Sequence, residues 1–181
     1  MRRFGWKGGV AAVVVLGALA AVAFGYFGVH KLWTDDEVNE AAPVFESQEQ
    51  AETGGGAGTT EDGDAAEEPT VQTEAQGSFV SLDHPTSGTA TVLGDGSGQR
   101  FLRFTGFETD NGPDLNVYLS TTPPDGDEST FDDDFVDLGD LRGNVGDQNY
   151  EIPTDVDLSR HHTVVIWCGR FSVPFGAAQL A

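Results

Sequence analysis

Hydrophobic and polar positions form three patterns along this chain. Residues 8–29 are a continuous apolar run without a charged side chain. Residues 34–76 are acidic and rich in glycine, alanine and threonine, with few apolar positions. From Gly77 onward, short apolar runs alternate with turn-forming residues. This pattern predicts three parts with boundaries at 1–33, 34–76 and 77–181.

The third part has the pattern of a series of short strands. Apolar positions alternate along 115–119, as in a strand with one buried face, whereas 164–167 is apolar on both faces, as in a central strand. No window of about a dozen residues shows helical periodicity. We therefore predict an all-β fold, an antiparallel β-sandwich of about eight short strands. The predicted strands are Ser78–Leu82, Gly88–Leu93, Phe101–Phe104, Leu115–Ser120, Phe135–Leu138, Gln148–Ile152, Thr163–Cys168 and Phe171–Phe175.

The apolar run 8–29 predicts one N-terminal transmembrane helix. As a helix it would be about 33 Å long, enough to cross a hydrocarbon core of about 30 Å. Arg2, Arg3 and Lys7 precede it and acidic residues follow, so the positive-inside rule predicts a cytoplasmic N-terminus. The alternative is a signal peptide cleaved after Ala21–Ala23. Both interpretations export the folded part, and the first predicts a single-pass protein of the cell membrane that contacts lipid through this helix.

Residues 34–76 predict a disordered acidic linker. They hold thirteen acidic and no basic residues, and this composition cannot recover the entropy of ordering. A coil of this length spans about 35 Å, so the linker is expected to act as a spacer between membrane and domain.

Charge and composition exclude several functions. The chain has 9 Lys plus Arg against 30 Asp plus Glu, a net charge of −21, and no basic stripe, so nucleic acid is not an expected partner. One cysteine excludes a scaffold of several disulfides. No nucleophile elbow, phosphate loop or zinc-protease motif occurs, so the sequence does not predict an enzyme. The acidic stretch Thr121–Asp134 is expected to be a long exposed loop.

Several motifs of the third part occur in the order found in one known family. These are Gly112-Pro113-Asp114-Leu115, then Val136–Leu141, then Gln148–Pro153, and finally Val164–Cys168 followed by Phe171–Val173 and Phe175-Gly176. In these motifs the chain resembles the DM-thirteen domain, also called the electron-transfer DM domain, over residues 77–181. The resemblance implies a β-sandwich on an exported protein and a redox role for the signature cysteine, Cys168. It also implies structural roles for Gly112, Pro113, Asp114, Leu138, Gly139, Tyr150, Pro153, Trp167, Phe171 and Phe175.

Cys168 is the candidate site residue, and besides a disulfide with another protein two interpretations of it stay open. In one it is a redox thiol or a prosthetic-group ligand, with Gly169 allowing close approach and Arg170 favouring the thiolate. In the other it is a small buried hydrophobe on a strand face with Val164 and Ile166. A single cysteine cannot run an internal dithiol–disulfide cycle, so electron transfer requires a cofactor or a redox partner protein.

No cofactor is the default expectation, with copper and non-covalent haem as weaker alternatives. A blue-copper site needs two histidines and a cysteine. His161 and His162 precede Cys168 by about 20 Å at strand rise, which leaves His84 as a weak metal candidate.

Two functions follow for the whole chain. The first is a membrane-anchored extracytoplasmic domain with an electron-transfer role centred on Cys168. The alternative is a non-catalytic cell-surface binding module in which the cysteine is structural.

Overall fold

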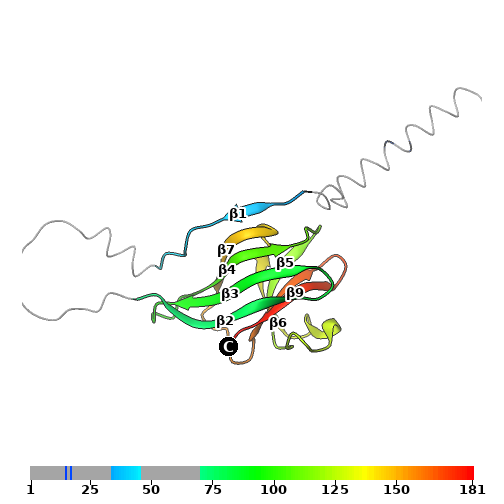
Figure 1. The fold of residues 1–181 in the computed structure, drawn as a ribbon. Helices are drawn as coiled ribbons and strands as arrows, with labels where there is room; N and C mark the ends of the chain where they lie inside the picture. Colours follow the sequence, from blue (N-terminus) through cyan, green and yellow to red (C-terminus); the bar gives the residue numbers. More distant parts are fainter. Residues whose placement is uncertain (1–14, 16, 18–33, 46–69) are drawn as a thin grey trace, which may run out of the picture.

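The computed structural model describes residues 34–45 and 70–181, together with Val15 and Gly17. The predicted transmembrane segment, apart from those two positions, and residues 46–69 of the predicted linker lie outside the described residues (Figure 1). Within the described part of the chain, no helix is long and apolar enough to span a membrane.

Nine strands form one sheet, in the order β1-β7-β4-β3-β2-β9-β8-β5-β6 (Figure 1). Every neighbouring pair is antiparallel except β1 and β7, which are parallel. The strands are β1 Glu37–Asn39, β2 Gln72–Ser81, β3 Thr86–Gly94, β4 Arg100–Thr109, β5 Leu115–Ser120, β6 Phe135–Asp140, β7 Val145–Ile152, β8 Thr163–Cys168 and β9 Val173–Gln179.

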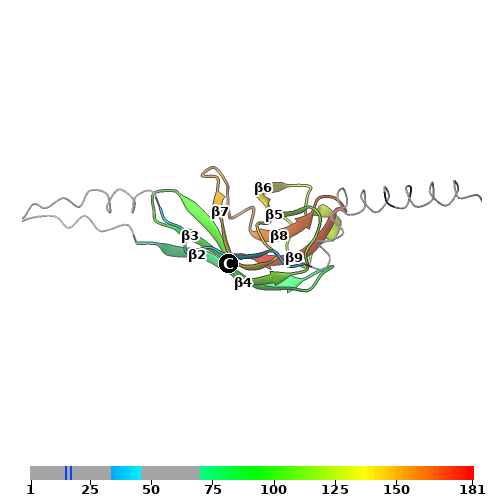
Figure 2. The same cartoon turned by 90° about the horizontal axis from the view of Figure 1, so that it is seen from above.

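The sheet curls over on itself because β2 belongs to both halves. Residues 72–78 of β2 pair with β3, whereas residues 79–81 pair with β9. Figure 2, turned by 90°, shows the strands wrapped around the core instead of lying in one plane. The all-β prediction is confirmed. The separate sheets of a sandwich are replaced by one continuous curled sheet, because a ten-residue strand is long enough to cross between the halves.

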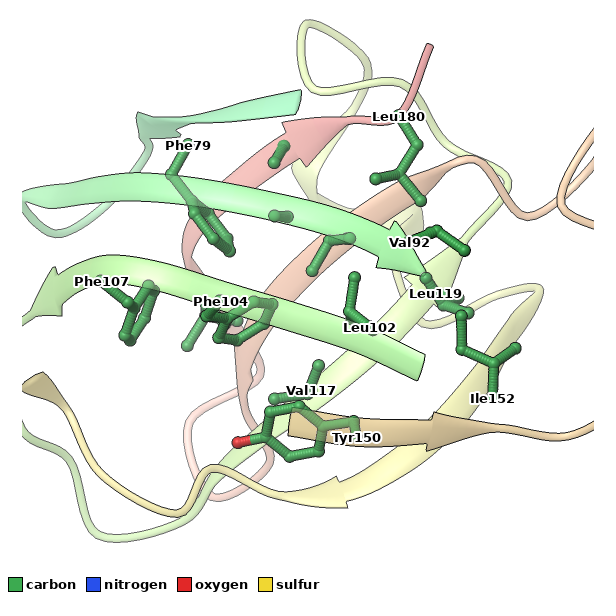
Figure 3. Close-up of a cluster of buried hydrophobic side chains, with 14 of the residues drawn as sticks. Phe79, Val92, Leu102, Phe104, Phe107, Val117, Leu119, Tyr150, Ile152 and Leu180 are labelled. Carbon is green, nitrogen blue, oxygen red and sulfur yellow. The ribbon is translucent and has the colours of Figure 1, made fainter. Parts of the chain in front are cut away.

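The core lies between the two halves of the curled sheet. Phe104 and Leu102 of β4 face Val117 of β5 and Ile166 of β8 across it, and all four side chains are fully buried. Figure 3 shows these aliphatic and aromatic side chains gathered between strands of both halves. The alternation seen in 115–119 and the apolar run 164–167 therefore mark strands as predicted.

A second cluster lies on the other face of the β8 half. It consists of Tyr118, Phe131, Val165, Trp167 and Ala177. Phe131 is fully buried and comes from the segment 121–134, which also carries the short 3-10 helix η2, Glu128–Thr130. The prediction of a wholly exposed loop is thus wrong at Phe131, because one aromatic side chain covers the apolar face of a central strand.

Two sequence boundaries need correction. The predicted disordered segment 34–76 includes β1 and the first five residues of β2, which pair with β7 and β3 respectively. Local composition was misleading there, because backbone pairing to a formed sheet edge compensates for low hydrophobicity. The last predicted strand, 171–175, begins instead at Val173, since Gly169–Ser172 form the turn between β8 and β9.

One end of the sheet collects four connections and the start of β1. Strand pairing places Ser81, Thr109, Asp140 and Cys168 at this end, with the first residues of β1, β3, β5, β7 and β9. We call it the Cys168 end. The turn at residues 95–99 and the loops 121–134 and 153–162 lie at the opposite end.

Candidate functional site

Cys168 is the last residue of β8 and is completely buried as a free thiol. It pairs with Leu115 of β5 on one side and with Val173 of β9 on the other. Both neighbours belong to or pack against the main core cluster, as Cys168 itself does. The sulfur is therefore part of the core in this conformation, which matches the packing interpretation of the sequence.

A four-residue turn, 169–172, covers the strand end that carries Cys168. The Cys168 carbonyl oxygen accepts hydrogen bonds from the Ser172 amide at 2.8 Å and the Phe171 amide at 3.3 Å. The side chains of Arg170 and Phe171 are exposed. Phe171, expected to be a structural residue of a strand, instead projects from this turn with 62% of its surface exposed.

Because Gly169 has no side chain, another group can approach it closely, and in the structure that group is the carboxylate of Asp114. A Cβ at this position would lie 3.0 Å from Asp114 Oδ2 and 3.4 Å from Asn116 Nδ2. The Gly169 amide also donates a 2.9 Å hydrogen bond to the Asp114 carbonyl. The turn is thus packed against the Gly112–Asp114 motif, and the two motifs of the sequence meet here.

His84 lies at the same end as Cys168 and stacks on Phe175. The ring centroids are 3.7 Å apart with an interplanar angle of 25°, and His84 Nδ1 lies 2.9 Å from Asp110 Oδ2. Phe175 is buried, and a Cβ on Gly112 would lie 3.1 Å from its ring. His84 is therefore linked to the core that holds Cys168 through an aromatic ring instead of a shared metal ligand set.

The donor set at this end does not fit a copper or haem site. Among the described residues, no three His, Cys, Asp or Glu side chains are arranged to hold a metal ion. His161 and His162 precede the first residue of β8, whereas Cys168 is its last, so they lie at opposite ends of that strand, as the sequence predicts. His161 instead lies 3.3 Å from Asp134.

Two polar cavities open at the Cys168 end, and Cys168 lines neither. The first, about 150 Å³, runs between the Gly112–Asp114 motif and the loop before β7, and includes Asp36, Asp140 and Asn144. The second, about 390 Å³, lies between β3 and β4 near Asp110. Prosthetic-group pockets are mostly apolar, so neither cavity fits a group ligated by this thiolate.

The remaining motif residues lie elsewhere in the sheet or its loops. Tyr150 is buried, donates a 2.7 Å hydrogen bond to Gln148 Oε1 and accepts one of 3.1 Å from the Arg142 amide. Burial raises the pKa of Tyr150 far above its ordinary value, so the hydroxyl stays a donor. Gly139 has φ +102° within β6, a conformation that favours glycine. The other three motif residues are partly buried Leu138, exposed Pro153 and buried Trp167.

Residues 34–45, which sequence reasoning assigned to the linker, bind along the outer edge of β7. We call this segment the strap. Phe45 is fully buried and packs edge-on against Phe101 at 5.2 Å. Glu40 pairs with Arg142 at 2.5 Å and accepts hydrogen bonds from the backbone and side chain of Asn149. The isolated apolar residues Val38 and Phe45 in an acidic stretch were the only sequence signal of this contact.

The strap enters the fold at the Cys168 end. The Asn111 side-chain amide donates to the Thr34 carbonyl at 2.8 Å, and the Asn144 amide donates to Asp35 Oδ1 at 2.9 Å. Asn144 Oδ1 accepts from the Asp36 amide at 2.7 Å. Asn144, which is buried, and Asn111, which is half-buried, fix the first residues of the strap beside the Gly112–Asp114 motif.

The described residues define a class: a small all-β domain with one free, buried cysteine at a strand end and an N-terminal segment bound to its sheet edge. The profile of the family described as electron transfer DM13 matches residues 78–180. The chain therefore belongs to the DM13 electron-transfer family. No curated protein and no solved structure gave a significant match.

Proposed function

We propose that the chain is a membrane-anchored, extracytoplasmic electron-transfer protein whose redox centre is Cys168. The family is described as one of electron transfer, and Cys168 is the only thiol in the sequence. The observation that carries the proposal is the placement of this thiol at a strand end, directly under the short exposed turn 169–172. We expect local opening of that turn to bring the sulfur to solvent without unfolding of the core.

The chemistry is thiol–disulfide exchange with a partner protein. In the opened state the Cys168 thiolate attacks one sulfur of the partner's disulfide. The partner's S–S bond breaks, a mixed disulfide forms at Cys168, and the second partner sulfur leaves as a thiolate that takes up a proton. Because this chain has no second cysteine, a thiolate of a second, reduced dithiol protein then attacks the Cys168 sulfur and releases the first partner as a dithiol. The other thiol of the second protein breaks the new mixed disulfide, so two electrons pass from that protein to the first partner and Cys168 returns to the thiol. Arg170, two residues after Cys168, is proposed to favour the anionic sulfur in the opened state.

Anchoring is proposed from the apolar run 8–29. Its length and the basic residues before it support a single span with the domain on the outer side. Membrane fractionation of the full chain tests this part separately: extraction by detergent but not by carbonate is the expected result, and release by carbonate would contradict it.

The test of the redox centre is the rate at which Cys168 of the full chain exchanges with dithiobis-nitrobenzoate, measured at increasing sub-denaturing urea. Exchange through a local opening has a rate nearly independent of urea, whereas exchange through global unfolding rises steeply with it. We expect the first behaviour, with Arg170→Gln several-fold slower. Arg160→Gln, which removes the same charge at the opposite end, is the matched control.

The alternative function is a non-catalytic binding module, and the complete burial of Cys168 favours it. If exchange occurs only along the global unfolding curve, the thiol is a packing residue and the redox centre is wrong. The unchanged binding of partners by Cys168→Ser would then identify the surface, and not the sulfur, as the functional part.

A further inference from the structure

The strap determines which end of the domain is nearest to the predicted membrane segment. That segment ends in the sequence at Val29, and the structure fixes Thr34 and Asp35 at the Cys168 end through Asn111 and Asn144. Five residue steps span at most about 17 Å of extended chain. With the strap bound, Thr34 at the Cys168 end therefore cannot lie farther than this from the end of the predicted membrane segment.

An unbound strap would give a different arrangement. The tether would then run from Val29 to the start of β2 at Gln72, and a coil of that length spans about 35 Å with no preferred orientation of the domain. Binding of residues 34–45 removes this freedom, because β1 pairs with the edge of β7 (Figure 1), Glu40 is held by Asn149 of β7, and Phe45 packs on Phe101 of β4.

We propose that the bound strap holds the Cys168 end towards the outer membrane surface, so that the electron partner is itself a membrane-held protein. This inference deepens the proposed function and rests on its membrane anchor. A gap of about 17 Å is narrower than a small soluble domain, which is about 30 Å across. A freely soluble partner is therefore excluded from the turn 169–172, whereas a membrane protein with a low outer surface can reach it.

The charge of this end defines the partner further. Asp36, Asp114 and Asp140 line the first cavity, and Asp35 and Asp110 line the second. Such a surface repels anionic lipid headgroups and favours a basic protein surface. The partner that fits is a membrane protein with a disulfide close to the bilayer and a basic outer face.

The experiment measures energy transfer from two positions on the full chain to headgroup-labelled lipid in phosphatidylcholine vesicles. A donor dye is placed at Phe171→Cys, in the turn beside Cys168, or at Ser97→Cys, exposed in the turn at the opposite end. These positions are separated by roughly the length of a nine-residue strand, about 30 Å. Labelling is brief, and the wild-type chain gives the background from buried Cys168.

We expect strong transfer from position 171 and at least several-fold weaker transfer from position 97. The variant Gly143→Ala removes the strap, because a Cβ there would overlap the Asp36 carbonyl oxygen and lie 2.7 Å from the Val38 side chain. In this variant the two signals should converge. Glu128→Ala, at an exposed position of η2 in the loop at the opposite end, serves as a control that leaves the strap in place.

Equal transfer from the two positions in the otherwise wild-type chain would overturn the inference, as would a difference that Gly143→Ala leaves unchanged. Failure of the chain to remain with the vesicles on flotation would remove the anchor and the inference together. If the orientation is found but Cys168 exchanges only on global unfolding, the redox centre fails and the membrane-facing orientation stands.

Discussion

Phe45 offers a quantitative test of whether the strap binds as one unit. Its side chain is fully buried against Phe101, although it lies in an acidic segment with a strand of only three residues. Burial of one phenylalanine contributes on the order of 2 kcal/mol, and truncation of one in a rigid core costs about 3–5 kcal/mol. We expect the strap to leave the edge of β7 while the other strands stay paired, because β1 pairs with the rest of the sheet only through β7. Phe45→Ala should therefore lower the free energy of unfolding only by the binding free energy of the strap, about 2 kcal/mol.

We expect Gly143→Ala to lower the free energy of unfolding by the same amount through a different contact. The φ of Gly143 is not in the left-handed region, so alanine suits the loop itself and is opposed only by the strap backbone. We expect Phe45→Ala, Gly143→Ala and the double variant to lose the same free energy in urea unfolding of residues 34–181. In residues 70–181, which lack the strap, Gly143→Ala should have no effect beyond about 0.5 kcal/mol. Protection of the β1 amides against hydrogen exchange should be lost in all three variants.

The refuting result is additivity. If the double variant loses the sum of the single losses, the strap does not leave as a unit and the two contacts act independently. If Gly143→Ala destabilises residues 70–181 as much as residues 34–181, its effect lies within the loop before β7 and the strap has no part in it.

Three further predictions concern single side chains. Cys168→Ser places a hydroxyl in the core and should cost about 1–3 kcal/mol in urea unfolding, so an unchanged midpoint would contradict the observed packing. Tyr150→Phe removes the hydroxyl that donates the 2.7 Å hydrogen bond to Gln148 Oε1, and it should lower the free energy of unfolding by about 1–2 kcal/mol in the same assay. Tyr26→Phe, in the predicted anchor, is the control in the full chain. Burial acts to raise the pKa of Glu40, but hydrogen bonds from Arg142 and Asn149 outweigh it and lower the pKa below its ordinary value of 4.5. Because the folded pKa is the lower one, its contribution is present above pH 4.5 and is lost as the pH falls further. Protection of the β1 amides should weaken between about pH 4.5 and pH 3, and a Glu40→Gln variant with the same pH dependence would disprove this origin.

The strands of the core could be predicted because each carries its own signal. The double-sided apolar run 164–167 is buried on both faces, as predicted. The alternation along 115–119 predicted a strand with one buried face, and the strand is there, but Tyr118 on its other face is also buried, in the second cluster. The curl of the sheet could not be predicted in this way. It depends on how β2 divides its backbone hydrogen bonds between β3 and β9, and side-chain pattern does not encode that division.

The candidate site was only partly visible in the sequence. Its motif residues pointed to Gly112–Asp114 and Cys168, and the structure brings both to one end through the hydrogen bond from Gly169 to Asp114. The strap was missed because its contacts are mostly backbone atoms and asparagine amides supplied by distant loops. Asn111 and Asn144 give no local pattern, and their role depends on tertiary placement.

The bound strap and the burial of the thiol both bear on which partner can react with Cys168. A permanently exposed thiol in an oxidising compartment would be oxidised or cross-linked without selectivity, whereas a sulfur under a short turn reacts only during local opening. A partner that meets the domain by free diffusion would have little time to find that opening. Under the proposed anchoring, a partner in the same membrane would be present at high effective concentration, and the proposed orientation would keep the turn facing it. Loss of the strap should therefore slow electron transfer to a membrane-held partner more than it slows exchange with dithiobis-nitrobenzoate, and this difference separates presentation of the thiol from its intrinsic reactivity.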